Sequence, residues 1–333
     1  MDYPLIFALI IAFGVFMYVF MDGFDLGVGI LFPITGQTEE ERDTMMNSVA
    51  PVWDGNETWL VLGGAALFGA FPLAYATILP ALYLPLLIML IALIFRGVAF
   101  EFRFKTVRAK HIWSIAFFGG SLVCTFTQGM VLGAYISGFL IEARGFVGGA
   151  FDWFGVFPMF TGLAVVAGYA ALGCGWLIMK TEGDLQDRCF RLMPGLVAAV
   201  LIAIVAVSIW TPFVEPRIAE RWFSLPNLFL LSPVPVAVAL CAVFLFRALR
   251  QRRDVQPFVL TLALFALSFI GLGISLWPVV VPPDITIWDA AAPDESLSFL
   301  LVGVAILIPV ILTYTAYTYY VFRGKVKAGE GYH

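Results

Sequence analysis

The residues of this sequence best suited to chemistry are acidic side chains that stand inside long apolar runs. The clearest pair is Asp22 and Asp25, in the segment Asp22-Gly23-Phe24-Asp25. A spacing of three residues places both carboxylates on one face of a helix. Placing one ionisable side chain at the centre of a membrane helix costs about 3 kcal/mol on insertion scales, so such residues usually serve a function. Carboxylates in this position are typical of proton relays.

A second polar segment, Trp53-Asp54-Gly55-Asn56-Glu57-Thr58-Trp59, precedes the next apolar run. Two interpretations are open. The spacing of Asp54 and Glu57 is that of a helix-capping box, and tryptophans favour the membrane interface. Alternatively, Trp53, Asp54, Asn56 and Glu57 belong to the same site as the first pair of carboxylates.

A third pair, Arg96 and Glu101, stands at the end of the third apolar run. An arginine that extends its head group toward water beside a nearby acid would explain the pair without any function. A role beside the other acids is the second interpretation. Gln128, a single polar residue in the fourth apolar run, is typical of a contact between membrane helices.

The composition indicates the surroundings of these residues. Hydrophobic residues make up 61% of the 333 positions, charged residues only 13%, and the mean hydropathy is +0.95. Water-soluble domains contain roughly 45–50% apolar and about 25% charged residues. A lipid bilayer is therefore the expected solvent for this chain, and the net charge of −4 gives no sign of a nucleic-acid partner.

The apolar runs predict nine membrane spans in a single integral-membrane helical domain, residues 1–333, of all-α class. The spans must be helices because a backbone in lipid has to satisfy its own hydrogen bonds. The Thr38/Glu41 capping-box pattern predicts a further short interfacial helix over residues 38–49. The predicted spans are approximately residues 4–32, 55–75, 78–100, 113–137, 154–179, 190–211, 226–246, 257–281 and 298–322.

Basic residues predict the orientation of the spans. Of the 19 lysines and arginines, 15 fall in one alternating set of loops and three in the other, while Arg96 lies within a span. Because positively charged loops stay inside the cell, the N-terminus is expected outside and the C-terminus in the cytoplasm. This orientation places Asp25, Asp54, Arg96 and Glu101 at the cytoplasmic ends of the first three spans. We therefore expect a path that takes up protons from the cytoplasm.

Histidines argue against a haem held by this chain. There are only two, His111 in a basic loop and His333 at the C-terminus. A haem buried in a helical bundle usually needs at least one axial histidine on a span, and a b-type haem needs two. The spacings typical of iron–sulfur, zinc or copper sites do not occur. No metal ligands are therefore predicted.

Three segments resemble subunit II of the cytochrome bd ubiquinol oxidases. They are residues 21–29 (Met-Asp-Gly-Phe-Asp-Leu-Gly-Val-Gly), residues 47–57 (Asn-Ser-Val-Ala-Pro-Val-Trp-Asp-Gly-Asn-Glu) and residues 95–101 (Phe-Arg-Gly-Val-Ala-Phe-Glu). The resemblance extends to Ile287-Trp288-Asp289 and to the stretch from Pro309 to Tyr320, and so covers the whole chain. The short loops and the second segment are more similar to the cyanide-insensitive branch of that family.

The resemblance implies two four-helix bundles plus one peripheral helix in the bacterial inner membrane. It implies a homologous subunit I that carries two b-type haems, one d-type haem and the quinol site, so that quinol and O₂ react on the partner. The reaction would oxidise quinol, reduce O₂ to water and contribute to the proton motive force. Some members hold a structural ubiquinone in subunit II, and whether a small third subunit joins is left open.

The resemblance also implies roles for individual residues. The proton-path acids of the family correspond to Asp25, Asp54 and Glu101, the last at a position that is often aspartate. Asp22, Trp53, Asn56, Glu57 and Arg96 are the polar and charged residues expected to support them.

Two other functions remain open from the sequence. A secondary transporter would also place carboxylates inside a helical bundle, although its binding site would be expected near the membrane midplane between matched halves. A purely structural partner subunit would need no ionisable path. The acids gather in one third of the chain and at one membrane face, which fits a path that crosses half of the membrane better than a transporter.

Overall fold

The computed structural model describes residues 1–326, so His333 and Lys327, one of the basic residues counted above, lie outside the described residues. Within that part, eight helical segments are long and apolar enough to cross a membrane, in agreement with eight of the nine predicted spans. They are α1 (Tyr3–Thr35), α4 (Pro72–Arg103), α5 (Lys110–Ser137), α6 (Val156–Lys180), α7 (Gly183–Val214), α9 with α10 (Asn227–Leu231 and Pro233–Arg250), α11 (Gln256–Leu276) and α13 (Asp294–Val321).

The ninth predicted span, residues 55–75, corresponds to a shorter helix, α3 (Trp53–Ala70), of 18 residues. Its first turns carry Asp54, Asn56 and Glu57, which lower its apolar content. The predicted boundary between the second and third spans, near residues 75–80, is wrong. The break lies at Phe71, because Pro72 starts α4, whereas Pro80 remains inside that helix.

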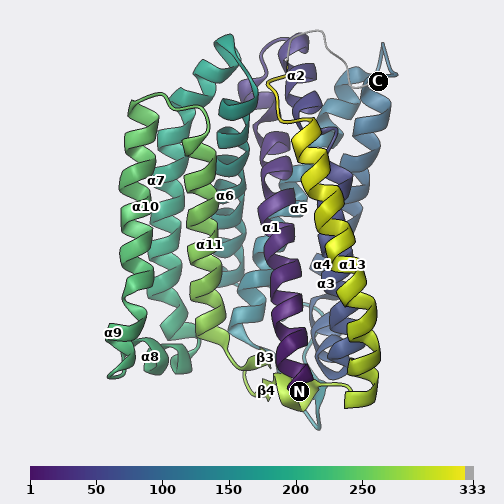
Figure 1. Ribbon diagram of the computed structural model, residues 1–333, viewed down its shortest axis with the longest axis vertical. Helices are drawn as coiled ribbons and strands as arrows, with labels where there is room; N and C mark the ends of the chain where they lie inside the picture. The colour runs from purple at the N-terminus through teal and green to yellow at the C-terminus, as the bar shows by residue number, and fades with distance from the viewer. Residues whose placement is uncertain (327–333) are drawn as a thin grey trace.

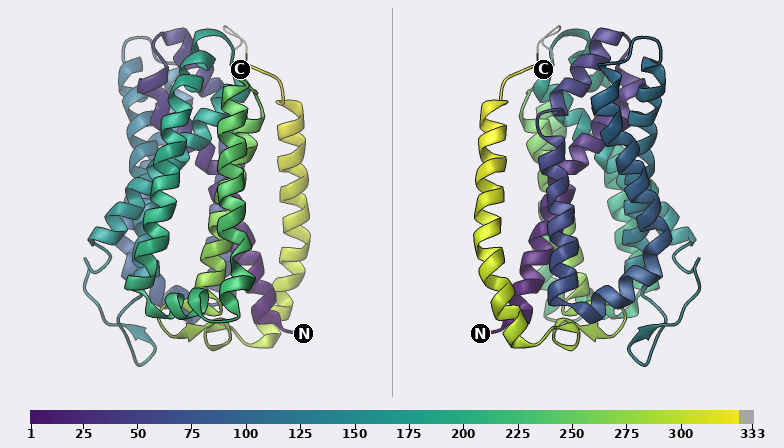
Figure 2. Two further views of the ribbon diagram at one scale, coloured as in Figure 1. Left: turned by 90° about the vertical axis from the view of Figure 1, so that its left-hand side faces the viewer. Right: turned by 90° about the vertical axis from the view of Figure 1, so that its right-hand side faces the viewer.

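The long helices run up and down beside one another, and α1 begins at the opposite end of the molecule from the end of α13 (Figure 1). The most extensive packing joins α4 to α5, α5 to α6, α1 to α6, α1 to α3 and α6 to α7. The α10–α11 pair packs on this group through α6 and α7. Helix α13 lies at the edge, with α1 and α3 as its neighbours (Figure 2).

A short polar helix, α2 (Glu39–Val49), lies across one end of the bundle, which we call the α2 end (Figure 1). Thr38 Oγ1 accepts a hydrogen bond from the Glu41 backbone N–H at 3.1 Å, and the Glu41 carboxylate accepts one from the Thr38 N–H, also at 3.1 Å. The capping box predicted at Thr38 and the helix that follows it are therefore confirmed.

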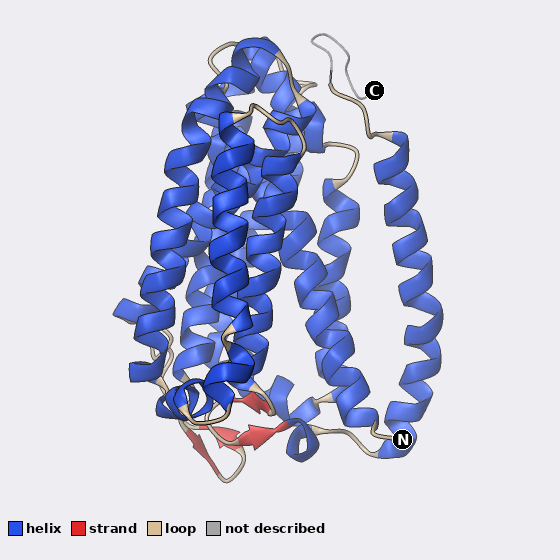
Figure 3. Cartoon of the chain, turned by 60° about the vertical axis from the view of Figure 1, so that its left-hand side comes forward, coloured by secondary structure: helices blue, strands red, loops and turns tan. Residues whose placement is uncertain are grey.

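The opposite end carries two small β-hairpins, which an all-α prediction does not include (Figure 3). The predicted span over residues 257–281 is too long at its far end. Helix α11 stops at Leu276, and Val279 and Val281 pair with Thr286 and Ile285 instead of continuing the helix. Pro278 and Pro282, which lack a backbone N–H, explain why this apolar segment leaves the helix. The elements at this end are β1 (Ile141–Glu142), β2 (Gly145–Phe146), α8 (Pro216–Phe223), β3 (Val279–Val281), β4 (Ile285–Thr286) and α12 (Ile287–Ala290).

Candidate functional site

The predicted pair of carboxylates lies in a buried cluster formed by three helices. Asp22 and Asp25 of α1 and Arg96 of α4 have no solvent-exposed side-chain surface, and Glu57 of α3 is 23% exposed. Arg96 Nη1 lies 3.1 Å from Asp22 Oδ1 and 2.5 Å from Glu57 Oε1, and its Nη2 lies 4.0 Å from Asp25 Oδ2. We call these four residues the acid cluster.

Glycines explain how α1 can hold these carboxylates so deep in the bundle. A Cβ atom at Gly27 would lie 1.8 Å from the backbone oxygen of Tyr169 in α6, and one at Gly173 would lie 2.3 Å from the backbone of Gly27. On α5, a Cβ at Gly120 would lie 3.0 Å from the backbone nitrogen of Arg96. Side chains at these positions would push the helices apart, so the glycines permit the backbone contacts that enclose the acid cluster.

Aromatic rings complete the surroundings of Arg96. The rings of Trp53 and Phe100 stack with centroids 4.8 Å apart and an interplanar angle of 4°. The Arg96 guanidinium lies 5.9 Å from the Trp53 ring centre and 5.6 Å from that of Phe100, within the range of cation–π attraction. A delocalised guanidinium suits both neighbours, since it can stack on rings while its N–H groups face carboxylates.

Polar side chains extend the acid cluster in two directions. Toward α13, Asn56 Nδ2 donates a hydrogen bond to Asp25 Oδ2 at 2.6 Å, and Tyr319 donates from its hydroxyl to Asn56 Oδ1 at 3.0 Å. Toward α5 and α6, Gln128 donates from Nε2 to the Tyr18 hydroxyl at 2.6 Å, and Tyr169 donates to Gln128 Oε1 at 3.0 Å. Gln128 thus links α1, α5 and α6, which confirms its interpretation as a helix–helix contact.

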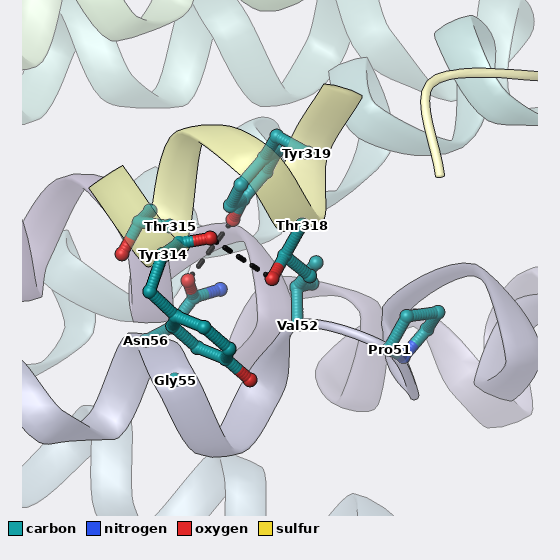
Figure 4. A pocket seen from close by; sticks show the side chains of 8 residues that line it. All are labelled: Pro51, Val52, Gly55, Asn56, Tyr314, Thr315, Thr318 and Tyr319. Atoms are coloured by element: carbon teal, nitrogen blue, oxygen red, sulfur yellow. Dashed lines mark hydrogen bonds between the residues drawn. The ribbon is translucent and has the colours of Figure 1, made fainter. Parts of the chain in front are cut away.

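A crevice between α3 and α13 reaches Asn56 from outside the acid cluster (Figure 4). Its volume is about 10 Å³, close to the minimum for one water molecule. The Thr315 hydroxyl in its wall is buried and has no hydrogen-bond partner among the described residues. The lining residues are Pro51, Val52, Gly55, Asn56, Tyr314, Thr315, Thr318 and Tyr319.

The structure does not bring all predicted acids into this cluster. Asp54 is exposed in the first turn of α3. It does not cap that helix, because the N-cap residue is Val52 and no side chain caps the helix start, so the capping interpretation of Asp54 and Glu57 is wrong. Glu101 is 66% exposed and pairs with Lys105 at 3.1 Å. Of the three predicted proton-path acids, only Asp25 lies in the cluster. Glu57, which was expected only as a supporting residue, is a member of the cluster because it contacts Arg96 directly.

A second set of ion pairs fastens α2 to the ends of three long helices. The buried Arg103 of α4 pairs with Asp43 and, at 3.0 Å, with Glu39. At the start of α5, Lys110 lies 3.0 Å from Asp43 and 3.3 Å from Glu39. Arg188 of α7 pairs with Glu41. The sequence offered no specific signal for these contacts, because surface acids and bases close to helix ends are common.

The acids of α2 respond to these cations. Partial burial raises the pKa of Glu41, but hydrogen bonds from Arg188 and from the backbone N–H groups of Thr38 and Gln37 outweigh it and hold the pKa below the ordinary glutamate value. The pKa of Glu39 is likewise lowered, because hydrogen bonds from Arg42 and Lys110 outweigh the effect of its partial burial. Both carboxylates are therefore charged anchors for α2 near neutral pH.

Metal ligands do not gather anywhere within residues 1–326, since no group of three or more His, Cys, Asp or Glu side chains there is arranged to hold a metal ion. His111 lies exposed in the first turn of α5, apart from the acid cluster. The acid cluster itself offers three carboxyl groups and one guanidinium, and buried carboxyl groups of this kind are typical of proton relays.

Comparison with known proteins agrees with the resemblance noted in the sequence. A model of the family described as cytochrome bd terminal oxidase subunit II matches residues 3–322. The chain is 31% identical to cytochrome bd ubiquinol oxidase subunit 2 of Bacillus subtilis (strain 168), over 94% of each sequence. It is 27% identical to cytochrome bd-I ubiquinol oxidase subunit 2 of Escherichia coli (strain K12), over 92% of this chain and 90% of that one.

A solved structure shares the fold. The chain superposes on one from the structure of bd oxidase from Geobacillus thermodenitrificans with a TM-score of 0.77 and 18% identity, covering 98% of this chain and 100% of the other. At that identity the likeness establishes the fold alone.

Proposed function

This chain belongs to the cytochrome bd terminal oxidase subunit II family, and we propose that its acid cluster takes up protons for the oxidase from the cytoplasm. The chain is a multi-pass protein of the bacterial inner membrane and a subunit of a quinol oxidase complex whose catalysis takes place on the partner. The observation that carries the proposal is the gathering of three carboxyl groups, two fully buried and one partly exposed, around one buried guanidinium.

The charges of the acid cluster favour proton binding. Arg96 can neutralise only one of the three carboxylates, and burying an uncompensated charge in a membrane is costly. Binding protons is the simplest way for Asp22, Asp25 and Glu57 to approach neutrality. In addition, Asp25 Oδ1 is buried and makes no hydrogen bond to the described residues, so it can exchange a hydrogen bond with water.

A short route would connect these carboxyls to the surface. Asp54 stands exposed at the start of α3, and the crevice between α3 and α13 leads from that helix end to Asn56. Asn56 bonds Asp25 directly, and Tyr319 fixes the orientation of the Asn56 amide. We place Asp54 at the mouth of the route and Asp25 at its inner end. Glu101 would act outside it, as an acid at the protein surface that attracts protons.

The proposal includes the topology. Helix α3 would form the ninth span, since α1 begins and α13 ends at opposite ends of the molecule, which requires an odd number of crossings. Helices α1, α3, α4 and α5 would form one four-helix bundle and α6, α7, α10 and α11 the other, with α13 peripheral, in one domain. The α2 end would face the cytoplasm because most basic residues precede or follow the helix ends located there.

The remaining chemistry would belong to the partner. A homologous subunit I would hold the b-type and d-type haems, oxidise quinol and reduce O₂, and proton uptake through this chain would contribute to the proton motive force. The cyanide-insensitive character, a structural ubiquinone and a small third subunit stay predictions. Haem and quinone extraction from the purified complex would test the cofactor assignments.

The test is Asp25→Asn in the purified complex, with Asp187→Asn as a matched control. Asp187 is a partly exposed acid on α7 that pairs with Arg252, apart from the acid cluster. Loss of a positioned proton-transfer group typically costs about 10²-fold or more in rate, so Asp25→Asn should slow quinol-driven O₂ consumption by roughly 10²-fold while the haem spectrum stays normal. Asp187→Asn should leave both unchanged.

Three other results would contradict the proposal. Turnover of Asp25→Asn equal to that of the unmodified complex would show that Asp25 carries no protons. Loss of haem together with loss of turnover would assign the cluster to assembly of the complex, which is the purely structural alternative. A haem-free preparation with substrate transport activity would favour the transporter.

A further inference from the structure

A groove at the α2 end, separate from the acid cluster, lies between the end of α1 and the first turns of α7. Its volume is about 290 Å³, and it is lined by Ile34, Thr35, Arg188, Arg191 and Leu192. Two arginines and two apolar residues thus meet where the apolar part of α7 begins. This combination is suited to a ligand that has both a negative charge and an apolar part.

The two arginines differ in how far their charge is already compensated. Arg188 donates from Nε to the Thr35 backbone oxygen at 2.9 Å and pairs with Glu41, so its positive charge is already compensated within the protein. Arg191 is exposed and makes no ion pair or hydrogen bond with the residues that the structure describes. The neighbouring acid Asp187 is paired with Arg252. The groove therefore keeps one uncompensated positive charge.

An apolar strip continues from Arg191 along α7. Gly195, Ala199 and Ile202 follow it at intervals of four, four and three residues, and all three are exposed. This spacing places them in one line on the helix surface. A Cβ at Gly195 would meet no atom within 4 Å, so the surface directly beyond Arg191 is low and open. Ile34, which is 56% exposed, borders the groove on the α1 side.

From this arrangement we infer that the groove binds an anionic phospholipid, with the phosphodiester at Arg191 and an acyl chain along Gly195 and Ala199. Basic pockets between membrane helices on the cytoplasmic side bind anionic head groups. Free phosphate would satisfy the charge but would leave the apolar strip unused, which is why the lipid is the better occupant. The inference does not depend on proton uptake by the acid cluster.

The experiment is native mass spectrometry of the purified complex titrated with phosphatidylglycerol. Phosphatidylcholine and inorganic phosphate are tested in parallel. Arg191→Gln is compared with Arg250→Gln, a substitution of another exposed arginine near the end of α10 that lies outside the groove. A basic residue near an anionic membrane surface contributes on the order of 1 kcal/mol, so Arg191→Gln should weaken phosphatidylglycerol binding about fivefold. Arg250→Gln should not change it.

A second variant separates lipid from free phosphate. Gly195→Leu fills the open surface beyond Arg191 but keeps the charge, and it should weaken phosphatidylglycerol binding while the complex stays intact. Phosphatidylcholine should bind more weakly than phosphatidylglycerol in every variant that retains Arg191. Displacement of the lipid by millimolar inorganic phosphate would overturn the inference in favour of a soluble anion. Equal binding by Arg191→Gln and Arg250→Gln would overturn the site itself. Oxidase turnover is not used as a readout, so failure here is distinguishable from failure of the proton proposal.

Discussion

Replacement of Arg96 by glutamine removes the only cation of the acid cluster. Its guanidinium lies 3.1 Å from Asp22, 2.5 Å from Glu57 and 4.0 Å from Asp25, and none of its surface is exposed. Removing one partner of a buried ion pair destabilises a protein by about 3–5 kcal/mol, because the remaining charge is left uncompensated. We expect Arg96→Gln to lower the free energy of unfolding by that amount near neutral pH. Arg96→Lys should cost less, since an ammonium keeps the charge and loses the stacking on Trp53 and Phe100.

The assay is a double-substitution cycle on the purified complex in mixed detergent micelles, unfolded with dodecyl sulfate and followed by circular dichroism. Asp22→Asn removes one uncompensated carboxylate, so it should restore part of the stability lost in Arg96→Gln. Residues in direct contact show coupling energies of about 0.5–3 kcal/mol. A loss below about 1 kcal/mol in Arg96→Gln, or additive effects of the two substitutions, would refute the description of these residues as a buried ion-pair network.

Three further predictions concern packing, acid stability and the exposed acid. Gly27→Ala should destabilise the complex by about 1–3 kcal/mol or more and so lower its thermal unfolding temperature, because the new Cβ would lie 1.8 Å from a backbone oxygen of α6. Gly119→Ala is the control, since its Cβ would meet no atom within 4 Å. Equal unfolding temperatures for the two variants would contradict the close-packing argument. Since the pKa of folded Glu41 is lowered, its pairing with Arg188 stabilises the chain above the unfolded glutamate pKa of about 4.3 and is lost as the pH falls through the folded pKa. Arg188→Gln should therefore destabilise the complex at about pH 7 and make less difference at about pH 3; a difference that grows on acidification would reverse the assigned sign. Glu101→Gln should reduce turnover less than loss of the buried carboxylate does, because water can replace an exposed side chain, and an equal loss in O₂ consumption would place it on the obligatory path.

The apolar runs predicted most of the fold because a bilayer allows few alternatives to a helix of sufficient length. They predicted the ends of the helices less well where an apolar segment is not helical or a polar segment is. The segment Val279–Val281 is as apolar as a span and yet forms β3; the prolines at 278 and 282 are the sequence feature that distinguishes it, and the predicted span over residues 257–281 did not take them into account. The first turns of α3 are polar and yet helical, and two of their polar side chains contact the acid cluster: Asn56 bonds Asp25 and Glu57 pairs with Arg96.

The candidate site was predictable where a charge stands alone in an apolar run, as at Asp22, Asp25 and Arg96. The residues that contact these charges were harder to assign, because contact depends on which face of its helix each side chain occupies. Glu101 follows Arg96 by five residues, which at 3.6 residues per turn places it roughly 140° around α4, away from the cluster. Tyr319 bonds Asn56 from a helix 263 residues further along the chain, and only the packing of α13 on α3 brings them together.

The attachment of α2 has a consequence for the order in which the chain assembles during synthesis. Helix α2 has 11 residues, fewer than the ~12–15 that an isolated helix needs even for marginal stability in water. The cations that fasten it, Arg103, Lys110 and Arg188, all follow it in the sequence. The segment that becomes α2 is therefore synthesised before α4, α5 and α7, which supply these cations. We expect it to become fully ordered only as those helices insert and pair with it.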